Sequence, residues 1–244
     1  MLRRATTGTA VALDGGLLLS IALPSIDAVF RDATPRTVLN RNLRLFLAGL
    51  RHASVPVAYF GREHLSWQRR PIAVGGLEME PSGALLVEVF FTARGDLAIP
   101  RELTTDVERS VDRYGGKATA SLGEAAPTKT LLEIADLALE GIAERVGTDP
   151  LEVQTSGEVR PDVAVASEIS PFPAGARALP PRAVPIGWLD VADTPAGIWV
   201  GGDVLAPSYV LGLGRSGPEH AISGGVPMEG ASWEDVKRAR DTSP

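Results

Sequence analysis

Hydrophobic residues recur every three or four positions in residues 36–52, which is the period of an amphipathic helix. The intervening positions on the other side of this period hold arginines. We therefore predict a helix with one buried apolar face and one solvated basic face over residues 36–52. The arginines of the basic face are Arg36, Arg41, Arg44 and Arg51.

A second segment, residues 128–146, follows the same period. Thr128 is the expected N-cap, because a threonine hydroxyl satisfies backbone N–H groups at a helix start. Gly147 is the expected end of the helix, with Arg145 in the last turn. A shorter amphipathic helix is predicted over residues 104–114.

Runs of apolar and β-branched residues bounded by turn signals predict strands before and between these helices. Asp14-Gly15-Gly16 and Pro81-Ser82-Gly83 are the strongest turn signals, and the first predicts a hairpin that begins with Thr9–Leu13. The other predicted strands are Leu17–Leu23, Val55–Phe60, Ile72–Glu78 and Ala84–Thr92.

The amino-acid composition of the chain changes after Gly147. Residues 150–187 are rich in proline, alanine, valine and glutamate, which is typical of an extended linker. We therefore expect two parts. Residues 1–148 form an α+β domain with a mixed or antiparallel sheet and flanking helices, and residues 149–244 form an irregular C-terminal extension. The extension's expected elements are strands at Ile186–Val191, Gly197–Val200 and Ser208–Leu213 and a helix at Ser232–Arg240.

Composition narrows the functional classes. The 244 residues are 44% hydrophobic and 22% charged, with a net charge of -6, so we expect a globular protein that does not bind nucleic acid. With no cysteine, the chain has no disulfide, thiolate metal site or cysteine nucleophile. Its three histidines are scattered, so no metal site is expected. The early apolar run is shorter than a membrane span and lacks a signal-peptide pattern, which predicts a cytoplasmic location.

Two segments carry candidate chemistry. The first, Arg3-Arg4-Ala5-Thr6-Thr7-Gly8-Thr9-Ala10-Val11, combines arginines with small residues. Arginine offers a fork of donors to phosphate or carboxylate, and small residues let the backbone approach a ligand. The second is Gly61-Arg62-Glu63-His64, followed by Arg69-Arg70-Pro71-Ile72-Ala73-Val74-Gly75-Gly76.

Taken in order, these segments resemble the catalytic domain of the biotin/lipoate protein ligases and lipoyl/octanoyl transferases, the BPL/LPL domain. That family carries Arg-Arg-x-Ser/Thr-Gly-Gly-Gly-Ala-Val, then Gly-Arg-Asn-Asp, then Arg-Lys-Ile-x-Gly-x-Ala. The resemblance covers roughly residues 2–147. It implies a cofactor-binding pocket whose lining residues in this chain are Arg3, Arg4, Thr6, Thr7, Gly8, Arg62, Gly75 and Gly76.

Pro71 occupies the position of the family's lysine, which holds the cofactor carboxylate and the acyl-adenylate. Proline has neither a charge nor an N–H group. Lys117, in a loop that resembles the family's Arg/Lys-Val-Thr-Ser/Asn-Leu loop, is the candidate substitute, and Arg69 and Arg70 are alternatives. His64 has the chemistry of a general base, although a loop histidine is more often a solvated surface residue.

The resemblance leaves two functional hypotheses. In the first, the chain is a divergent ATP-dependent, AMP-forming ligase or acyltransferase that uses ATP with Mg²⁺ and joins lipoate, octanoate or biotin to a lipoyl- or biotinyl-carrier protein. In the second, it is a non-catalytic pseudoenzyme or accessory subunit that binds the ligand or the carrier. A purely structural subunit with a closed pocket is a third reading.

Family members usually have a helix and strands before the Arg-Arg strand. We expect this layer to come from an upstream start, from a partner chain, or from the segment around Pro207–Ser216 in a permuted order.

Overall fold

The computed structural model describes residues 15–34, 37–61, 63–80, 82–95, 97, 114, 116–147, 175–180, 182–184, 187–195, 197–202, 234, 235, 238 and 241. The predictions for Thr9–Leu13, residues 104–114 apart from Tyr114, and Ser208–Leu213 lie outside these residues. Of the predicted helix Ser232–Arg240, the described residues 234, 235 and 238 are helical.

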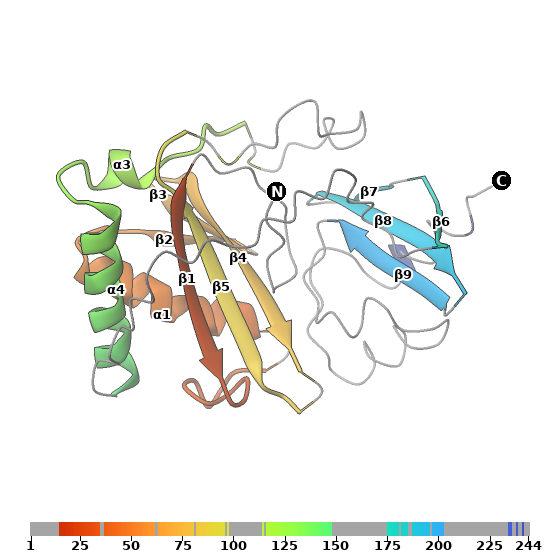
Figure 1. Ribbon diagram of the computed structural model, residues 1–244, viewed down its shortest axis with the longest axis horizontal. Coiled ribbons are helices and arrows are strands. Elements are labelled where there is room, and N and C mark those ends of the chain that lie inside the picture. The colour runs from red at the N-terminus through yellow and green to blue at the C-terminus, as the bar shows by residue number, and fades with distance from the viewer. Residues whose placement is uncertain are drawn as a thin grey trace.

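A five-stranded antiparallel sheet forms the main part of the described chain (Figure 1). Its order is β1-β5-β4-β3-β2, so β5 and β4 are central and β1 and β2 lie at the ends of the order. The strands are β1 (Gly16–Leu23), β2 (Ala58–Gly61), β3 (His64–Trp67), β4 (Arg70–Met79) and β5 (Leu85–Thr92).

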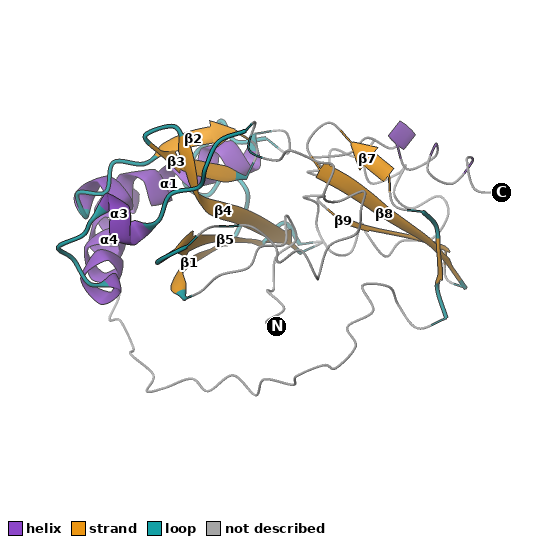
Figure 2. Cartoon of the chain, turned by 90° about the horizontal axis from the view of Figure 1, so that it is seen from above, coloured by secondary structure: helices purple, strands orange, loops and turns teal. Residues whose placement is uncertain are grey.

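Two long helices cover one face of this sheet. Helix α1 (Val38–His52) contacts β2, β4 and β5, and helix α4 (Leu131–Val146) packs against α1 and β1 (Figure 2). A short helix, α3 (Leu122–Ala125), precedes α4. The apolar core lies between the helices and the sheet and includes Phe46 of α1 and Phe91 of β5, both without exposed surface. The predicted α+β fold with helices flanking an antiparallel sheet is confirmed.

The start of α4 differs from the sequence prediction. Thr130, not Thr128, is the N-cap: its hydroxyl accepts from the Glu133 N–H while the Glu133 carboxylate accepts from the Thr130 N–H. Such a reciprocal capping box requires glutamate three residues after the threonine, and Thr128 has leucine there. The predicted end is confirmed, since Gly147 adopts a left-handed conformation with φ 77°.

The strand predictions were accurate for β1, β4 and β5, and wrong at two places. The strand expected at Val55–Phe60 begins three residues later, at Ala58, and β3 was not predicted. Pro81-Ser82-Gly83 falls between β4 and β5 as expected, where Gly83 N–H donates to the Glu80 carbonyl.

Four short strands of the C-terminal part form a separate antiparallel sheet (Figures 1 and 2). β6 and β7 pair with successive parts of β8, and β9 pairs with β8. The strands expected near residues 186–191 and 197–200 are therefore present and joined in one sheet. The expectation of an extended linker over residues 150–187 is wrong at its end, because β6 and β7 lie there and pair with β8. These strands are β6 (Arg177–Ala178), β7 (Arg182–Val184), β8 (Gly187–Thr194) and β9 (Gly197–Gly202).

Candidate ligand-binding face

Strand alternation gives the five-stranded sheet a second face, turned away from α1 and α4. On β5, Val89 and Phe91 belong to the core, so Glu88 and Phe90 point the other way. The register of the neighbouring strands extends this side, which we call the polar face. Its members include Leu18, Ser20 and Ala22 of β1, His64 of β3, Val74, Gly76 and Glu78 of β4, and Leu86, Glu88 and Phe90 of β5.

The polar face contains three rows of paired positions across β4, β5 and β1, and the third joins Glu78, Leu86 and Ala22. The first row, which we call the apolar row, joins His64, Val74, Phe90 and Leu18 through directly paired positions. The second row joins Gly76, Glu88 and Ser20 in the same way. A largely apolar strip therefore lies beside a strip with a carboxylate and a hydroxyl.

Glu88 is the charged group at the centre of this face and is only 6% exposed. Ser20 Oγ donates to Glu88 Oε1 at 3.3 Å, and Glu88 makes further interactions. Burial of a carboxylate is costly unless such partners are present. A ligand carboxylate placed beside Glu88 would be repelled, because like charges at close range disfavour each other.

The expectation that His64 is a solvated loop residue is wrong. His64 begins β3, is 8% exposed, and packs its ring edge-on against Tyr114 with centroids 5.4 Å apart. Its Nδ1 lies 3.9 Å from Oε2 of the fully buried Glu63. The four residues of β3 alternate between polar and apolar, but four residues are too few to establish the period of a strand.

The surroundings of Pro71 and Arg70 are occupied by protein contacts. The Pro71 carbonyl accepts from the Ala120 N–H at 2.7 Å. Arg70 donates to the Thr119 carbonyl and pairs with the Glu124 carboxylate at 3.1 Å. Arg70 thus binds the segment before α3 to β4.

Arg69 lies in the turn between β3 and β4 with φ 63°, a left-handed conformation that is uncommon for residues other than glycine. Its neighbour Gln68 also has a positive φ, of 49°. The turn carries Arg69 beyond the ends of both strands. Neither arginine offered as a substitute cation is therefore a member of the polar face.

Lys117 lies between Tyr114, which packs against His64, and Ala120, which donates to the Pro71 carbonyl. Its Nζ is 4.9 Å from the centroid of the Phe60 ring on β2, and its side chain is exposed. A cation over an aromatic ring at an exposed site contributes only about 0.5–1 kcal/mol. The preceding Gly116 has φ 71°, which glycine adopts at little cost.

The two predicted glycines on β4 point to opposite sides. A Cβ on Gly75 would come within 3.1 Å of the Glu63 carbonyl and 3.4 Å of Leu43 Cδ2, so Gly75 faces α1. Gly76 pairs with Glu88 on the polar face. The other predicted lining residues lie outside the described residues, namely Arg3, Arg4, Thr6, Thr7, Gly8 and Arg62.

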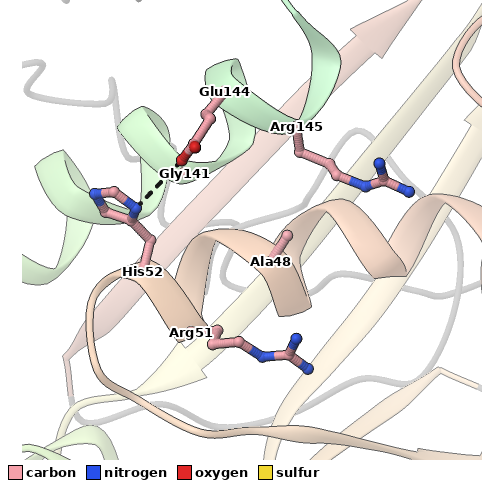
Figure 3. A pocket seen from close by; sticks show the side chains of 6 residues that line it. All are labelled: Ala48, Arg51, His52, Gly141, Glu144 and Arg145. Atoms are coloured by element: carbon pink, nitrogen blue, oxygen red, sulfur yellow. Dashed lines mark ion pairs between the residues drawn. The ribbon is translucent and has the colours of Figure 1, made fainter.

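A separate open pocket of about 400 Å³ lies where α1 crosses α4 (Figure 3). His52 Nδ1 is 3.6 Å from Glu144 Oε2 on one side of it, and Arg51 and Arg145 extend on the other. Both arginines lie in the last turns of their helices, where cations offset the helix dipole. This pocket contains none of the predicted site residues, and helix packing accounts for its charges.

The described residues include no group of three or more histidine, cysteine, aspartate or glutamate side chains arranged to hold a metal ion. In the same part of the chain, no helix is both long and apolar enough to span a membrane.

The chain was compared with protein families, curated proteins and solved structures. No protein-family model matches the chain, and no curated protein matches it significantly. Among solved structures, P. falciparum LipL1 in complex with lipoate aligns over 82% of this chain and 61% of its own, with 13% identity and a TM-score of 0.52.

Two ligases give lower scores. The bi-partite lipoate protein ligase from Thermoplasma acidophilum, described with its E2 lipoyl domain, aligns over 60% of this chain and 58% of its own, with 19% identity and a TM-score of 0.45. Biotin protein ligase from Aquifex aeolicus aligns over 55% and 53%, with 18% identity and a TM-score of 0.34. The chain matches 53–61% of the length of these three proteins. It has a fold of the biotin/lipoate ligase type.

Proposed function

We propose that this protein binds a carboxylic acid with an apolar chain, of the lipoate, octanoate or biotin class, on the polar face of its five-stranded sheet. Support comes from the shared fold, because the LipL1 structure of that fold holds lipoate. The opposite face is filled by the packed core, and the polar face has exposed or partly exposed members at the β1 and β5 end, among them Leu18, Ser20 and Phe90.

The observation that carries the proposal is the apolar row beside the pair formed by Glu88 and Ser20. Small-molecule sites are mostly apolar and contain a few placed polar groups that set orientation. The apolar row suits an acyl chain, and the Ser20 hydroxyl with the Glu88 carboxylate suits a polar group that donates hydrogen bonds.

The described residues around Pro71 and Glu88 do not fit the triphosphate of ATP. Pro71 has no donor, Arg70 is paired with Glu124, and Glu88 adds negative charge to the face. Phosphate recognition needs cations or clustered N–H groups. We therefore derive no adenylation step. The role we propose first is that of a non-catalytic, ligand-binding accessory protein, with a lipoyl- or biotinyl-carrier protein or a ligase as its partner.

A divergent ligase or acyltransferase is the second candidate, and the position of Lys117 beside the polar face favours it. In that case Arg3, Arg4 and Arg62 remain predicted residues of the cofactor-binding pocket, where arginine suits phosphate or carboxylate. For both the accessory role and the ligase role, we propose that the chain has two domains, residues 1–148 and residues 149–244. The sheet of β6–β9 belongs to the second domain.

Thermal unfolding of the purified full chain, with and without lipoate, octanoate or biotin, tests ligand binding. A ligand at 100 times its Kd stabilises the folded state by about 2.7 kcal/mol, so at least one acid is expected to raise Tm by several degrees. If none of the three acids changes Tm, the proposal fails.

Pyrophosphate exchange with ATP separates the two roles. The accessory role predicts that no acid stimulates exchange, although one of them raises Tm. Acid-stimulated exchange would contradict the accessory role and establish the ligase.

A further inference from the structure

We propose that the solvent-exposed side of α4 binds an amphipathic helix of a partner protein, a helix whose apolar stripe is flanked by lysine or arginine. This side of α4 is separate from the polar face, so binding there is independent of the proposed function. α4 presents two features that suit such a partner, namely an exposed apolar stripe and an acidic row beside it.

α4 carries more apolar residues than the core uses. Its buried residues Ile134, Ala138 and Ile142 belong to the core between the helices and the sheet. A second apolar set recurs at helical spacings of three and four on another side of the helix and is not part of that core. We call this set the α4 stripe, and its members are Leu132, Ala135, Leu139, Ala143 and Val146.

The α4 stripe is open to solvent at both ends. Leu132 is 63% exposed and Val146 is 37% exposed, and the three members between them are half-buried. With a rise of about 1.5 Å per residue, the stripe is roughly 21 Å long, about four helical turns. Singly exposed apolar residues need no explanation, whereas a continuous strip of them indicates an interaction surface.

The order of side-chain sizes along the α4 stripe favours a helix as its occupant. Leucine or valine at both ends and at the centre alternates with alanine at positions 135 and 143. Large side chains of a partner helix fit over the alanines, and the larger members of the stripe fit between side chains of the partner. This is the ridge-into-groove packing of two helices.

Carboxylates follow the stripe along its solvent side at the same helical spacing. His52 lies 3.7 Å from Glu140 and 3.6 Å from Glu144, and Lys129 lies near Glu133. Even with both of these cations counted, four carboxylates leave the row negative. We call this set the acidic row, and its members, all exposed, are Glu133, Asp136, Glu140 and Glu144.

Charge determines which kind of helix fits beside the acidic row. Lysine or arginine next to the partner's own apolar stripe would face these carboxylates, and such complementarity gives specificity and faster association. In an antiparallel pair of two copies of this chain, the two acidic rows would lie along the same side and repel each other. The acidic row therefore favours a basic partner over a second copy.

The test measures binding of the full-length protein to three labelled four-turn model helices by fluorescence anisotropy. The first has a leucine stripe with lysine flanks, the second has the same stripe with glutamate flanks, and the third has the composition of the first in scrambled order. The protein is expected to bind the first about tenfold more tightly than either of the others. Equal binding of the first and third helices would overturn the proposal, because charge alone would then account for it.

Two double variants locate the binding surface. Leu132→Ser/Val146→Ser is expected to weaken binding of the lysine-flanked helix about tenfold, because less apolar area is buried. Asp136→Asn/Glu140→Gln is expected to weaken it about threefold and to reduce its dependence on salt. The controls are Ala58→Ser on β2 and Glu80→Gln after β4, both at exposed positions, and they are expected to leave it unchanged.

Thermal unfolding of each variant verifies that it is folded. Failure of wild type to bind the lysine-flanked helix, or equal affinity of wild type and Leu132→Ser/Val146→Ser for it, would overturn the proposal. Sedimentation velocity tests the other occupant. A wild-type dimer that this variant fails to form would assign the α4 stripe to a second copy and overturn the proposal as well.

Discussion

The two faces of the five-stranded sheet are built from the same strands and have different tasks. On β5, Val89 and Phe91 have no exposed surface and pack against the helices, whereas Glu88 and Phe90 alternate with them on the polar face. A side chain thus packs into the core while its sequence neighbour lies on the face where we propose ligand binding.

Substitution of the two phenylalanines of β5 gives the largest expected contrast. Phe91→Ala empties a fully buried site and is expected to cost about 3–5 kcal/mol of unfolding free energy. Phe90→Ala removes a partly exposed ring and is expected to cost much less. Urea denaturation of both variants measures this difference. Equal losses would contradict the assignment of the two residues to different faces.

The helix layer that covers one face depends on close packing at Gly49. A Cβ on Gly49 would overlap the Ala138 carbonyl oxygen and lie 2.9 Å from Ile142 Cγ1. Gly49→Ala is therefore expected to cost about 1–3 kcal/mol, because overpacking forces α1 and α4 apart. Ala48→Gly, one position away at the open pocket, is the control and is expected to cost about 1 kcal/mol or less, from helix propensity. A neutral Gly49→Ala would show that the crossing is looser than described.

The smallest expected effect concerns the start of α4. The Thr130 backbone N–H and hydroxyl, which donate to the Glu133 carboxylate, lower the pKa of Glu133 below its usual 4.5. A lowered folded-state pKa means that the ionised form stabilises the fold above pH 4.5, and that this contribution is lost as the pH falls through the folded-state pKa.

Glu133→Gln is therefore expected to lower Tm slightly at pH 7 and to flatten the decline of Tm below pH 4.5. Glu140→Gln, on the same helix, is the control. Parallel Tm–pH curves for wild type and Glu133→Gln would contradict this role.

Much of the fold was readable from the sequence because its long elements have strong periods. Each long element buries a continuous apolar stripe against the same core, and the sequence shows the period of that stripe. These elements are α1, α4, β1, β4 and β5. The shorter β3 has four residues, too few to establish a period. At Thr130 a capping-box spacing was present, and the prediction at Thr128 overlooked it.

The site was less predictable because its geometry depends on register. Between Leu65 and Ser66 the pairing of β3 with β4 shifts, because Leu65 pairs with Ala73 and Ser66 pairs with Pro71. The face on which Gly75 or Gly76 lies depends on how β4 pairs with its neighbours. The burial of His64 likewise follows from a pairing with Val74 that no local pattern specifies. Arg70 pairs with Glu124, a residue 54 positions later in the chain, and no local pattern specifies this contact.

Photo-crosslinking of the full chain with a diazirine-bearing octanoic acid, mapped by mass spectrometry, tests the central claim most directly. The polar face and the pocket between α1 and α4 are the two candidate locations. Our account predicts crosslinks at Phe90 and Leu18 that unlabelled octanoate competes away. Competed crosslinks confined to Ala48, Arg51 and Gly141 would contradict it.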